Sequence, residues 1–343
     1  MGGISMEKIV VVGGSGFIGS WVVKELSSDY NVVIVDVKKP RTGDHGADFR
    51  RCDIRSYASV EECLRDADLV INTAVVQIPR INEEKKLGYE VNIVGAQNVC
   101  EAVYRNPRVR GLIHTGSWHV IGEVGIVGIV DEAFGYRPDK VEDRARLYVL
   151  SKVAQEVIVR YYDEMDSSKV YSVIRLGTVL GEGMPEGTAA SIFINRALKG
   201  EPITPYRHSM YRPMLFVDIR DVVEAFRRLA AKILDGELSG EENSINHVIN
   251  FFHPEPVTII ELAHIVKRAT IEVTRGTIDP PIQVVDLGYP QLFEENSKAY
   301  FRVNVSKAQE LLKLEYLIPP DESIKRLVKL KYSEKITLHS SDK

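Results

Sequence analysis

Short apolar runs rich in β-branched residues alternate with segments whose apolar residues recur at helical spacing throughout the first half of the chain. The apolar runs predict buried strands, and the segments between them predict helices. The expected elements are, in order, a strand, turn and helix over 8–26, strands at 31–40 and 49–54, a helix at 59–67, a strand at 68–75, a helix at 89–104 and a strand at 109–117. This alternation predicts an α/β fold with a Rossmann-type doubly wound parallel sheet.

The second half of the chain continues the alternation after an interruption. Residues 182–210 hold several glycines and prolines, which predicts that the chain leaves the sheet there. The other expected elements are a helix at 146–165, a strand at 169–181, a strand and helix over 214–233, an exposed loop at 232–243 and a short strand at 244–251.

A glycine-rich turn, GGSGFIG at 13–19, joins the first strand to the first helix. Gly13 would allow the tight turn, Gly16 the close approach of the backbone to a pyrophosphate, and Gly19 the packing of helix on strand. Phe17 and Ile18 complete the turn, so the phosphates would lie at the helix N-terminus. The turn therefore predicts a dinucleotide site.

Asp36 closes the second strand about twenty residues after the turn. An acidic residue at this point accepts hydrogen bonds from an adenosine ribose, which favours NAD as the cofactor. Lys38, Lys39 and Arg41 follow at once and could accept a 2′-phosphate, so the sequence leaves NADP open.

Tyr148 and Lys152 stand four residues apart in RLYVLSK (146–152), within the predicted helix 146–165. Positions i and i+4 share a helix face, so the ammonium of Lys152 can lie beside the phenol of Tyr148. A neighbouring cation favours the phenolate, so we expect Lys152 to lower the pKa of Tyr148 and make it a general base.

Composition and charge exclude several function classes. A net charge of −4 provides no basic surface for nucleic acid, and 44% apolar content over 343 residues supports a full core. Cys52, Cys63 and Cys100 show no pairing pattern, which predicts buried thiols in a reducing compartment and no metal site. No apolar stretch reaches membrane-spanning length and the N-terminus lacks a signal-peptide core, so we expect a cytoplasmic protein with a small-molecule partner.

With these motifs in order, the chain resembles the extended short-chain dehydrogenases/reductases, in the group of NAD-dependent nucleotide-sugar epimerases and dehydratases. The resemblance spans roughly residues 8–330. The matching segments, besides the glycine-rich turn and Asp36, are CDI (52–54), NTA (72–74), VNIVGAQNV (91–99), TGSWHVIG (115–122), YVLSK (148–152), VIRLGTVLG (173–181), RPMLFVDIRDV (212–222) and FRVNVSKAQELL (301–312).

The resemblance implies a role for each of several residues. Ser117 would orient the substrate oxygen that Tyr148 deprotonates, while Lys152 would hold the nicotinamide ribose and stabilise the phenolate. The other implied roles are adenine contacts for Asp53 and Ile54, a place in the dinucleotide groove for Ala74, buried polar support for Asn92, and diphosphate binding for Arg212 and Arg302.

Two departures from the family pattern bear on substrate. Similar sugar dehydratases and decarboxylases carry acidic residues directly after the serine, whereas this chain has Trp118 and His119, which disfavours both reactions. His119 could titrate near neutral pH and touch substrate, or simply pack. Many relatives also place an asparagine where this chain has Thr178, whose hydroxyl would replace the contact to a nucleotide sugar.

Three functions remain open on the sequence. The leading one is an NAD-dependent epimerase of a sugar or nucleotide sugar, which would oxidise a hydroxyl carbon transiently and return the hydride to its other face. The second is a dehydrogenase that releases NADH after oxidising a sugar, uronate or hydroxysteroid-like alcohol. The third is an NAD-binding sensor without turnover, which has no need for Ser117, Tyr148 and Lys152.

The resemblance also implies a division into domains and an oligomeric state. We expect an NAD-binding domain of residues 6–175, with 211–250 returning to it, and a substrate-binding lobe of 176–210 and 251–335. The helices at 89–104 and 146–165 resemble those that form a four-helix interface, so we expect a homodimer. Apolar positions compatible with that interface, or with covering the sheet, are Val91, Val94, Val99 and Val103.

Overall fold

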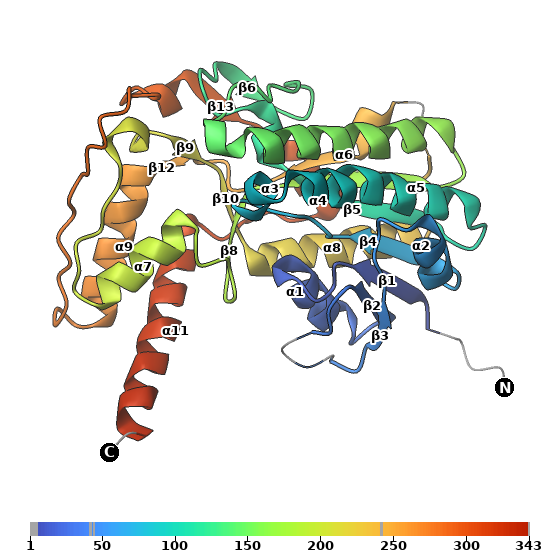
Figure 1. The fold of residues 1–343 in the computed structure, drawn as a ribbon, viewed down its shortest axis with the longest axis horizontal. Helices are drawn as coiled ribbons and strands as arrows, with labels where there is room; N and C mark the ends of the chain where they lie inside the picture. The colour runs from blue at the N-terminus through green and yellow to red at the C-terminus, as the bar shows by residue number, and fades with distance from the viewer. Residues whose placement is uncertain (1–5, 41–42, 44, 241–242, 342–343) are drawn as a thin grey trace.

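The computed structural model of the protein describes residues 6–40, 43, 45–240 and 243–341 (Figure 1). Within these residues seven parallel strands form one sheet in the order β11–β7–β5–β4–β1–β2–β3. The strands are β1 (Lys8–Val12), β2 (Asn31–Asp36), β3 (Asp48–Arg51), β4 (Leu69–Asn72), β5 (Gly111–Ser117), β7 (Val170–Leu176) and β11 (Val248–Phe251). The doubly wound α/β sheet predicted from the alternation is confirmed.

The strands are apolar along their length because helices cover both faces of the sheet. In β1, the sequence KIVVV is buried from Ile9 to Val12, and it pairs in register with β2 from Lys8 opposite Asn31 to Val12 opposite Val35. The interior strand β5 is buried at every position. Because the seven strands are parallel, their carboxyl ends lie along one edge of the sheet.

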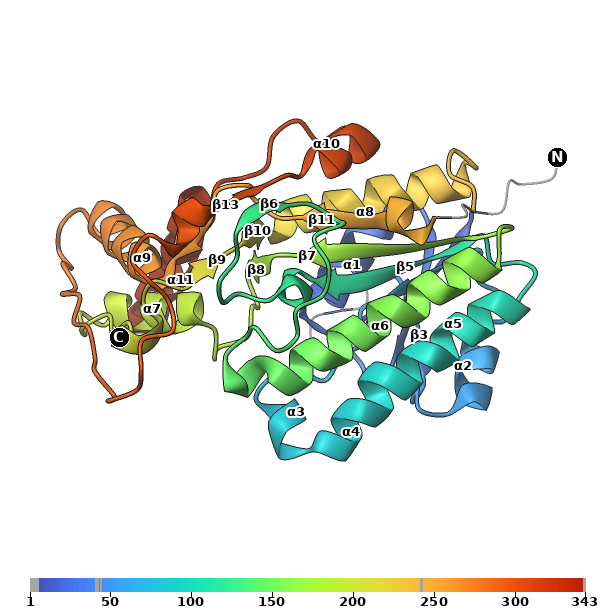
Figure 2. The same cartoon turned by 90° about the horizontal axis from the view of Figure 1, so that it is seen from above.

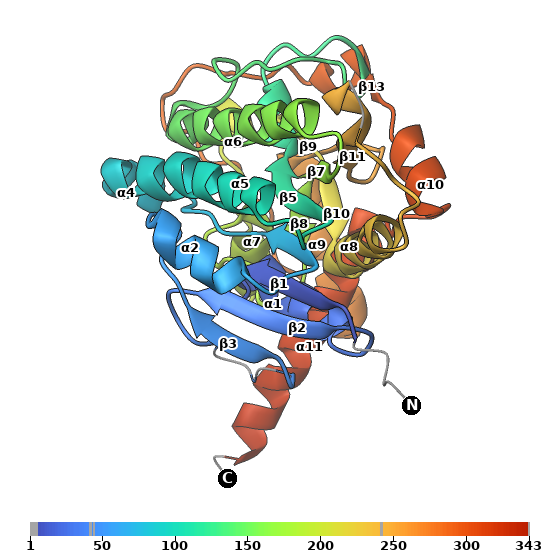
Figure 3. The same cartoon turned by 90° about the vertical axis from the view of Figure 1, so that its right-hand side faces the viewer.

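Figure 3 shows the two helical layers on either side of the sheet. Helices α1 (Phe17–Leu26) and α8 (Ile219–Leu234) pack together on one face, and α2 (Tyr57–Leu64), α5 (Ala96–Arg105) and α6 (Arg146–Met165) pack side by side on the other. Val99 and Val103 are fully buried against the sheet, whereas Val94 is 47% exposed. Val99 and Val103 therefore cover the sheet, and Val94 does not.

A second group of helices lies beyond one end of the sheet (Figures 1 and 2). Helix α9 (Ile259–Val273) packs against both α7 (Ala189–Leu198) and α11 (Pro320–Ser341) around a separate apolar core. Thr258 and Glu261 form a capping box that begins α9. The remaining elements are β6 (Gly128–Val130), β8 (Thr178–Leu180), β9 (Pro213–Met214), β10 (Phe216–Asp218), β12 (Val257–Thr258), β13 (Phe301–Val303), α3 (Arg80–Glu83), α4 (Lys85–Tyr89) and α10 (Ser306–Leu312).

Three predicted elements need correction. The strand expected at 169–181 is two strands, because the chain turns at Gly177 and β8 pairs with β10 instead of continuing the main sheet. A Cβ at Gly177 would lie 2.8 Å from both the Leu215 carbonyl oxygen and the Phe252 Cβ, so only glycine permits this passage. The helix expected at 89–104 begins earlier, with α4, and passes through a π-helical stretch, Glu90–Gly95, before α5. The strand expected at 244–251 begins at Val248, after a 3₁₀ turn.

Two predictions about the whole chain can be compared with the structure. Cys52, Cys63 and Cys100 are free and buried, as expected for structural thiols. None of the helices in the described part of the chain combines the length and the apolar character needed to cross a membrane.

Candidate active site

One large cavity, with a volume of about 1290 Å³, runs along the carboxyl ends of the strands. Most of the residues that the sequence singled out for cofactor and substrate line it. They are Gly13, Gly16, Phe17, Ile18, Gly19, Asp36, Asp53, Ile54 and Ala74 toward one end, and Ser117, Tyr148, Lys152, Thr178 and Arg212 toward the other. Arg302 is exposed on β13 and is not among the residues that line it.

The glycine-rich turn forms a wall of bare backbone at one end of the cavity. Gly13 has φ +77°, and a Cβ there would lie 2.6 Å from the Ala74 nitrogen. A Cβ on Gly19 would lie 2.3 Å from the Gly13 carbonyl oxygen. Gly16 precedes α1, and no side chain of the described residues caps that helix. The first-turn amides of α1 are therefore available to an anionic group, which fits the pyrophosphate of a dinucleotide.

Asp36 is fixed at the carboxyl end of β2. Its Oδ2 accepts the Ser15 amide and its Oδ1 accepts the Lys38 amide, each at 3.1 Å. The carboxylate is thus oriented before any ribose arrives. Lys38 also lines the cavity, while Arg41 lies outside the described residues.

Asp53 and Ile54 follow β3 at the same end of the cavity. The Asp53 carboxylate pairs with the Arg55 guanidinium at 2.6 Å, and that hydrogen bond lowers the pKa of Asp53. Ile54 packs against the π-helical stretch, since a Cβ on Gly95 would lie 2.5 Å from the Ile54 Cδ1. Both residues line the cavity.

Ser117, Tyr148 and Lys152 come together where α6 crosses the end of β5. Ser117 is the last residue of β5, and Tyr148 and Lys152 lie one turn apart on the facing side of α6. The Lys152 Nζ donates to the Thr115 carbonyl oxygen at 2.8 Å. The structure therefore brings the three residues into one pocket, as helical spacing predicted for Tyr148 and Lys152 and as the family resemblance implied for Ser117.

The expected effect of Lys152 on Tyr148 is wrong for the site as it stands. Part of the Tyr148 ring faces the cavity, but the protein surrounds the phenol, and this burial raises its pKa to about 12, against a smaller lowering by the Ser117 hydroxyl. Burial likewise lowers the pKa of Lys152 to about 7, opposed by the Glu156 carboxylate. Desolvation disfavours both charged forms, and helical spacing alone does not reveal it.

A chain of polar contacts extends from Ser117 away from Tyr148. The Ser117 Oγ lies 3.1 Å from the His119 Nδ1, and the His119 Nε2 lies 3.0 Å from the Glu123 Oε1. The Glu123 side chain is only 1% exposed, and the nearby Arg212 guanidinium and His119 offset its burial, so its pKa is lowered. Neither Glu123 nor its link to His119 was recognised in the sequence. The four-residue spacing is the only signal there, and it spans a glycine turn rather than a helix.

Arg212 lines the cavity but is already paired. Its Nη1 lies 2.9 Å from the Glu142 Oε2 and 3.8 Å from the Glu123 Oε2, while its Nε has no hydrogen-bond partner among the described residues. Thr178 also has a protein partner, because its Oγ1 accepts from the Trp118 Nε1 at 3.3 Å. Both predicted substrate contacts are therefore at the site, and both are engaged by side chains that the sequence did not connect to them.

Asn92 is fully buried in the π-helical stretch that precedes α5. Its Oδ1 accepts the Val76 amide at 2.7 Å, and its Nδ2 donates to the Val76 carbonyl and to the Ser151 Oγ, each at 3.0 Å. Asn92 thus ties the loop after β4, which lines the cavity, to α6. This is the buried polar support that the family resemblance implied.

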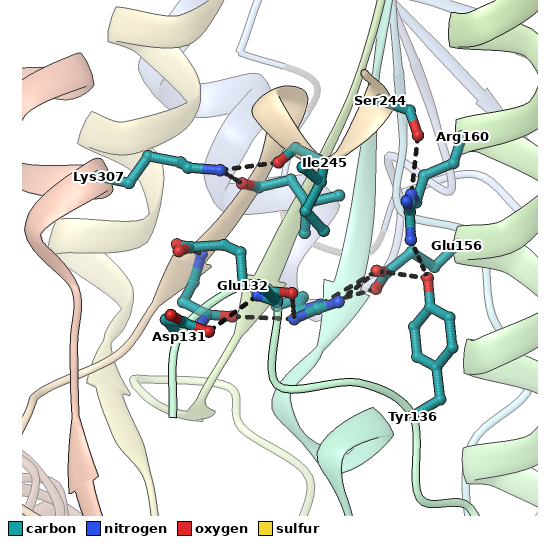
Figure 4. Close-up of polar contacts among 12 residues, drawn as sticks. Asp131, Glu132, Tyr136, Glu156, Arg160, Ser244, Ile245 and Lys307 are labelled. Carbon is teal, nitrogen blue, oxygen red and sulfur yellow. Dashed lines mark hydrogen bonds and ion pairs between the residues drawn. The ribbon is translucent and has the colours of Figure 1, made fainter. Parts of the chain in front are cut away.

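A buried ion pair fixes the other side of α6. The Arg175 Nη2 lies 2.6 Å from the Glu156 Oε1, and the two side chains are 1% and 0% exposed. Figure 4 shows the continuation of this cluster: the Tyr136 hydroxyl donates to Glu156 at 3.0 Å and accepts from Arg160 at 2.9 Å. Because Glu156 lies one turn after Lys152, the cluster also places a negative charge behind the active-site lysine.

No group of side chains in the described part of the chain has the composition and geometry to hold a metal ion.

Comparison with known proteins identifies a family and several relatives. The model of the NAD dependent epimerase/dehydratase family matches residues 9–243. A putative UDP-glucose 4-epimerase of Methanocaldococcus jannaschii is 28% identical over 263 residues, which cover 72% of this chain and 82% of that protein. A D-erythronate dehydrogenase of Haemophilus influenzae is 25% identical over 205 residues, covering 57% of this chain and 62% of that one.

Among solved structures, MoeE5 in complex with UDP-glucose and NAD is similar to this chain with a TM-score of 0.74. The two are 23% identical, and the match covers 96% of this chain and 99% of the other. At this identity the likeness concerns the fold.

Proposed function

We propose that this chain, which belongs to the NAD dependent epimerase/dehydratase family, is an NAD-dependent epimerase of a sugar, with a nucleotide sugar as the substrate class. The observation that carries the proposal is the meeting of Ser117, Tyr148 and Lys152 in the cavity whose other end is the bare-backbone turn at Gly13–Gly19. A proton-transfer set and a dinucleotide cradle are thus held at opposite ends of one cavity.

The residues of the chain would divide the work as follows. The Asp36 carboxylate, which two backbone amides hold in place, would accept hydrogen bonds from the hydroxyls of the adenosine ribose. The Lys152 Nζ, which donates to the Thr115 carbonyl oxygen, would donate to the nicotinamide ribose instead. Ser117 orients the substrate hydroxyl and Tyr148 exchanges its proton. NAD, when bound, accepts the hydride and returns it.

The substrate end favours a ligand with acidic oxygens. The Arg212 guanidinium lines this end of the cavity beside Glu142, so a diphosphate oxygen would accept from it in place of the Glu142 carboxylate. We assign no such role to Arg302, which lies outside the cavity lining. The putative UDP-glucose 4-epimerase among the relatives supports uridine-diphosphate sugars as the first class to test.

A second candidate is a dehydrogenase that releases NADH. The contact chain from Ser117 to His119 and Glu123 favours it, because a net oxidation leaves a proton that must be taken up. The D-erythronate dehydrogenase among the relatives points the same way.

Purified protein tests the two functions together. For the epimerase we expect NAD that survives dialysis, and conversion of UDP-glucose to UDP-galactose without net NADH. Stoichiometric NADH release would establish the dehydrogenase instead. Tyr148→Phe should abolish turnover in either case, whereas Tyr161→Phe, an exposed position on the same helix, serves as the matched control. Turnover by Tyr148→Phe at the wild-type rate would contradict both functions.

We further propose a homodimer and the division into two lobes expected from the sequence. Apolar and aromatic side chains remain exposed along α4, the π-helical stretch, α5 and α6: Tyr89, Val94, Tyr104, Leu150, Val157, Tyr161 and Met165. A second copy would cover them, which supports pairing through these helices. In this arrangement the cavity lies between the NAD-binding domain and the lobe of α7, α9 and α11, and its far wall, with Met184 and Thr188, selects the substrate.

A further inference from the structure

Each ring nitrogen of His119 lies next to a polar side chain, a hydroxyl at Nδ1 and a carboxylate at Nε2. Its Nδ1 faces the Ser117 hydroxyl at 3.1 Å, and its Nε2 faces the buried Glu123 carboxylate at 3.0 Å. Its ring also meets the Tyr148 ring edge to face, with centroids 6.2 Å apart. With both nitrogens engaged, the imidazole has no free atom to offer a substrate directly. Its remaining chemistry runs through Ser117.

The carboxylate decides the tautomer of the ring. The two buried Glu123 oxygens satisfy no hydrogen bond with the described residues as the side chains stand, and the His119 Nε2 lies 3.0 Å from Oε1. Glu123 is ionised and can only accept, so the hydrogen of neutral His119 belongs on Nε2, facing the carboxylate, and Nδ1 carries a lone pair. The Ser117 hydroxyl then donates to Nδ1, and its oxygen accepts from the His119 amide at 3.3 Å. A Ser117 hydroxyl whose hydrogen points at Nδ1 can only accept from the neighbouring Tyr148 phenol, with which it interacts. The hydrogen bonds therefore run in one direction, from Tyr148 through Ser117 to His119.

We propose that Ser117, His119 and Glu123 form a proton relay that receives the proton of the substrate hydroxyl by way of Tyr148 and holds it on the His119 imidazole. The inference rests on the proposed function, because it needs an alcohol oxidised at Tyr148. His119 is the proton acceptor of the relay, and Glu123 is a positioning residue that fixes the tautomer.

The step balances without a phenolate intermediate. As the substrate C–H bond breaks, its hydride passes to NAD and its hydroxyl proton passes to the Tyr148 oxygen. Tyr148 gives its own proton to the Ser117 oxygen, and Ser117 gives its own to the His119 Nδ1. The products are a carbonyl, a reduced cofactor and an imidazolium beside the Glu123 carboxylate, while Tyr148 and Ser117 are unchanged. This matters because burial raises the pKa of the Tyr148 phenol to about 12, which makes a free phenolate costly.

The surroundings of the relay suit this role. The charged groups that face it are Arg212, which lies 3.8 Å from Glu123, and, around Arg212, Glu142 and Arg144. His119 is 21% exposed to the cavity, so the stored proton can return to the substrate in an epimerase or leave to solvent in a dehydrogenase.

The first test needs no substrate. Long-range ¹⁵N NMR of the imidazoles, with the His119 signals assigned by their loss in His119→Asn, reports which nitrogen carries the hydrogen in the wild-type protein. We expect hydrogen on Nε2 and a bare Nδ1, and a shift toward the other tautomer in Glu123→Gln. Hydrogen on Nδ1 in the wild-type protein would overturn the relay, since that atom could not accept from Ser117, and it would leave the proposed function untouched.

The second test measures turnover with NAD and UDP-glucose as the probe. His119→Asn keeps a polar group near Ser117 but takes up no proton, and we expect a loss in kcat of about 10²-fold at neutral pH, at the low end for a general acid–base group, with KM little changed. The pH dependence of kcat should change in this variant, because the proton acceptor of the relay is gone.

Variants at two carboxylates separate the relay from a structural role. Glu123→Gln should lower kcat by about 10-fold or more, and Glu123→Asp should restore part of it, because only a carboxylate fixes the tautomer. Asp139→Asn is the matched control, since Asp139 pairs with Lys140 at the surface and does not contact His119; it should keep the wild-type kcat and pH profile. Wild-type kcat and pH profile in His119→Asn would refute the relay even where the enzyme is active.

Discussion

Replacing Glu156 by Gln should destabilise the protein strongly, although the change removes a single charge. The Arg175 guanidinium gives three of its contacts to Glu156, at 2.6, 3.0 and 3.1 Å, and both side chains are fully buried. A glutamine keeps the shape but leaves the cation without its counter-charge. Removing one partner of a buried pair costs about 3–5 kcal/mol, because the remaining charge stays desolvated.

The expected loss translates into a measurable shift of the melting temperature. A chain of 343 residues gains roughly 0.7 kcal/mol per kelvin of unfolding entropy at its midpoint, so Glu156→Gln should lower Tm by about 4–7 °C. Differential scanning calorimetry measures it directly. The double variant Glu156→Leu/Arg175→Met is the matched control, since removing both charges leaves neither unpaired and should recover most of the loss.

The same substitution should change the site through Lys152. Glu156 is the group that opposes the lowering of the pKa of Lys152 by burial, so its loss should lower that pKa further below about 7. The ammonium is then lost at lower pH, and NAD affinity, followed by fluorescence titration, should begin to fall with rising pH earlier than in the wild type. A Tm within 1 °C of the wild type, with an unchanged pH dependence of NAD binding, would refute the argument that this ion pair supports both the fold and the lysine.

Three further predictions concern other parts of the molecule. Gly19→Ala should lose NAD retention after dialysis, because its Cβ would lie 2.3 Å from the Gly13 carbonyl oxygen; a variant that retains NAD would show that the turn can shift. Burial raises the pKa of Asp221 to about 6, so the stability that Asp221 contributes should be lost as the pH rises from about 4 to 6; melting curves of Asp221→Asn should therefore gain on those of the wild type over that range, and a constant difference would contradict this. The proposed dimer should be converted to a monomer by Leu150→Glu, and wild-type protein that scatters light only as a monomer at micromolar concentration would contradict it.

The main sheet was predictable because its physics is local. Strands buried on both faces require continuous β-branched runs, and the run at 8–12 became β1 at the expected residues. The strand expected at 169–181 failed for a reason that lies elsewhere in the chain. Gly177 passes between Leu215 and Phe252, and this close approach ends β7 and redirects the chain into β8.

Some features of the active site could likewise be predicted from the sequence, and others could not. Tyr148 and Lys152 could be placed together because spacing defines a helix face, and the family resemblance added Ser117 at a strand end. The pKa values could not be predicted from spacing, since they depend on burial. Glu123 could not be predicted either, because its approach to His119 requires the left-handed turn at Gly122, with φ +70°, between a 3₁₀ turn and the following loop.

The two departures from the family pattern, at Trp118 and Thr178, contact each other in the structure. Together they say more about substrate recognition than either does alone. Trp118 stands where related dehydratases carry an acid, and Thr178 stands where many relatives carry an asparagine, yet the Trp118 Nε1 donates to the Thr178 Oγ1. The threonine hydroxyl is therefore partly committed to the protein and replaces the missing asparagine contact only in part. Next to this pair, His119 turns to Ser117 and Glu123 rather than to the cavity centre. This wall of the cavity is thus partly occupied by contacts within the protein itself. A substrate recognised here would depend more on Arg212 and on the loop at 184–190, both of which line the cavity, than on the positions that such enzymes usually use.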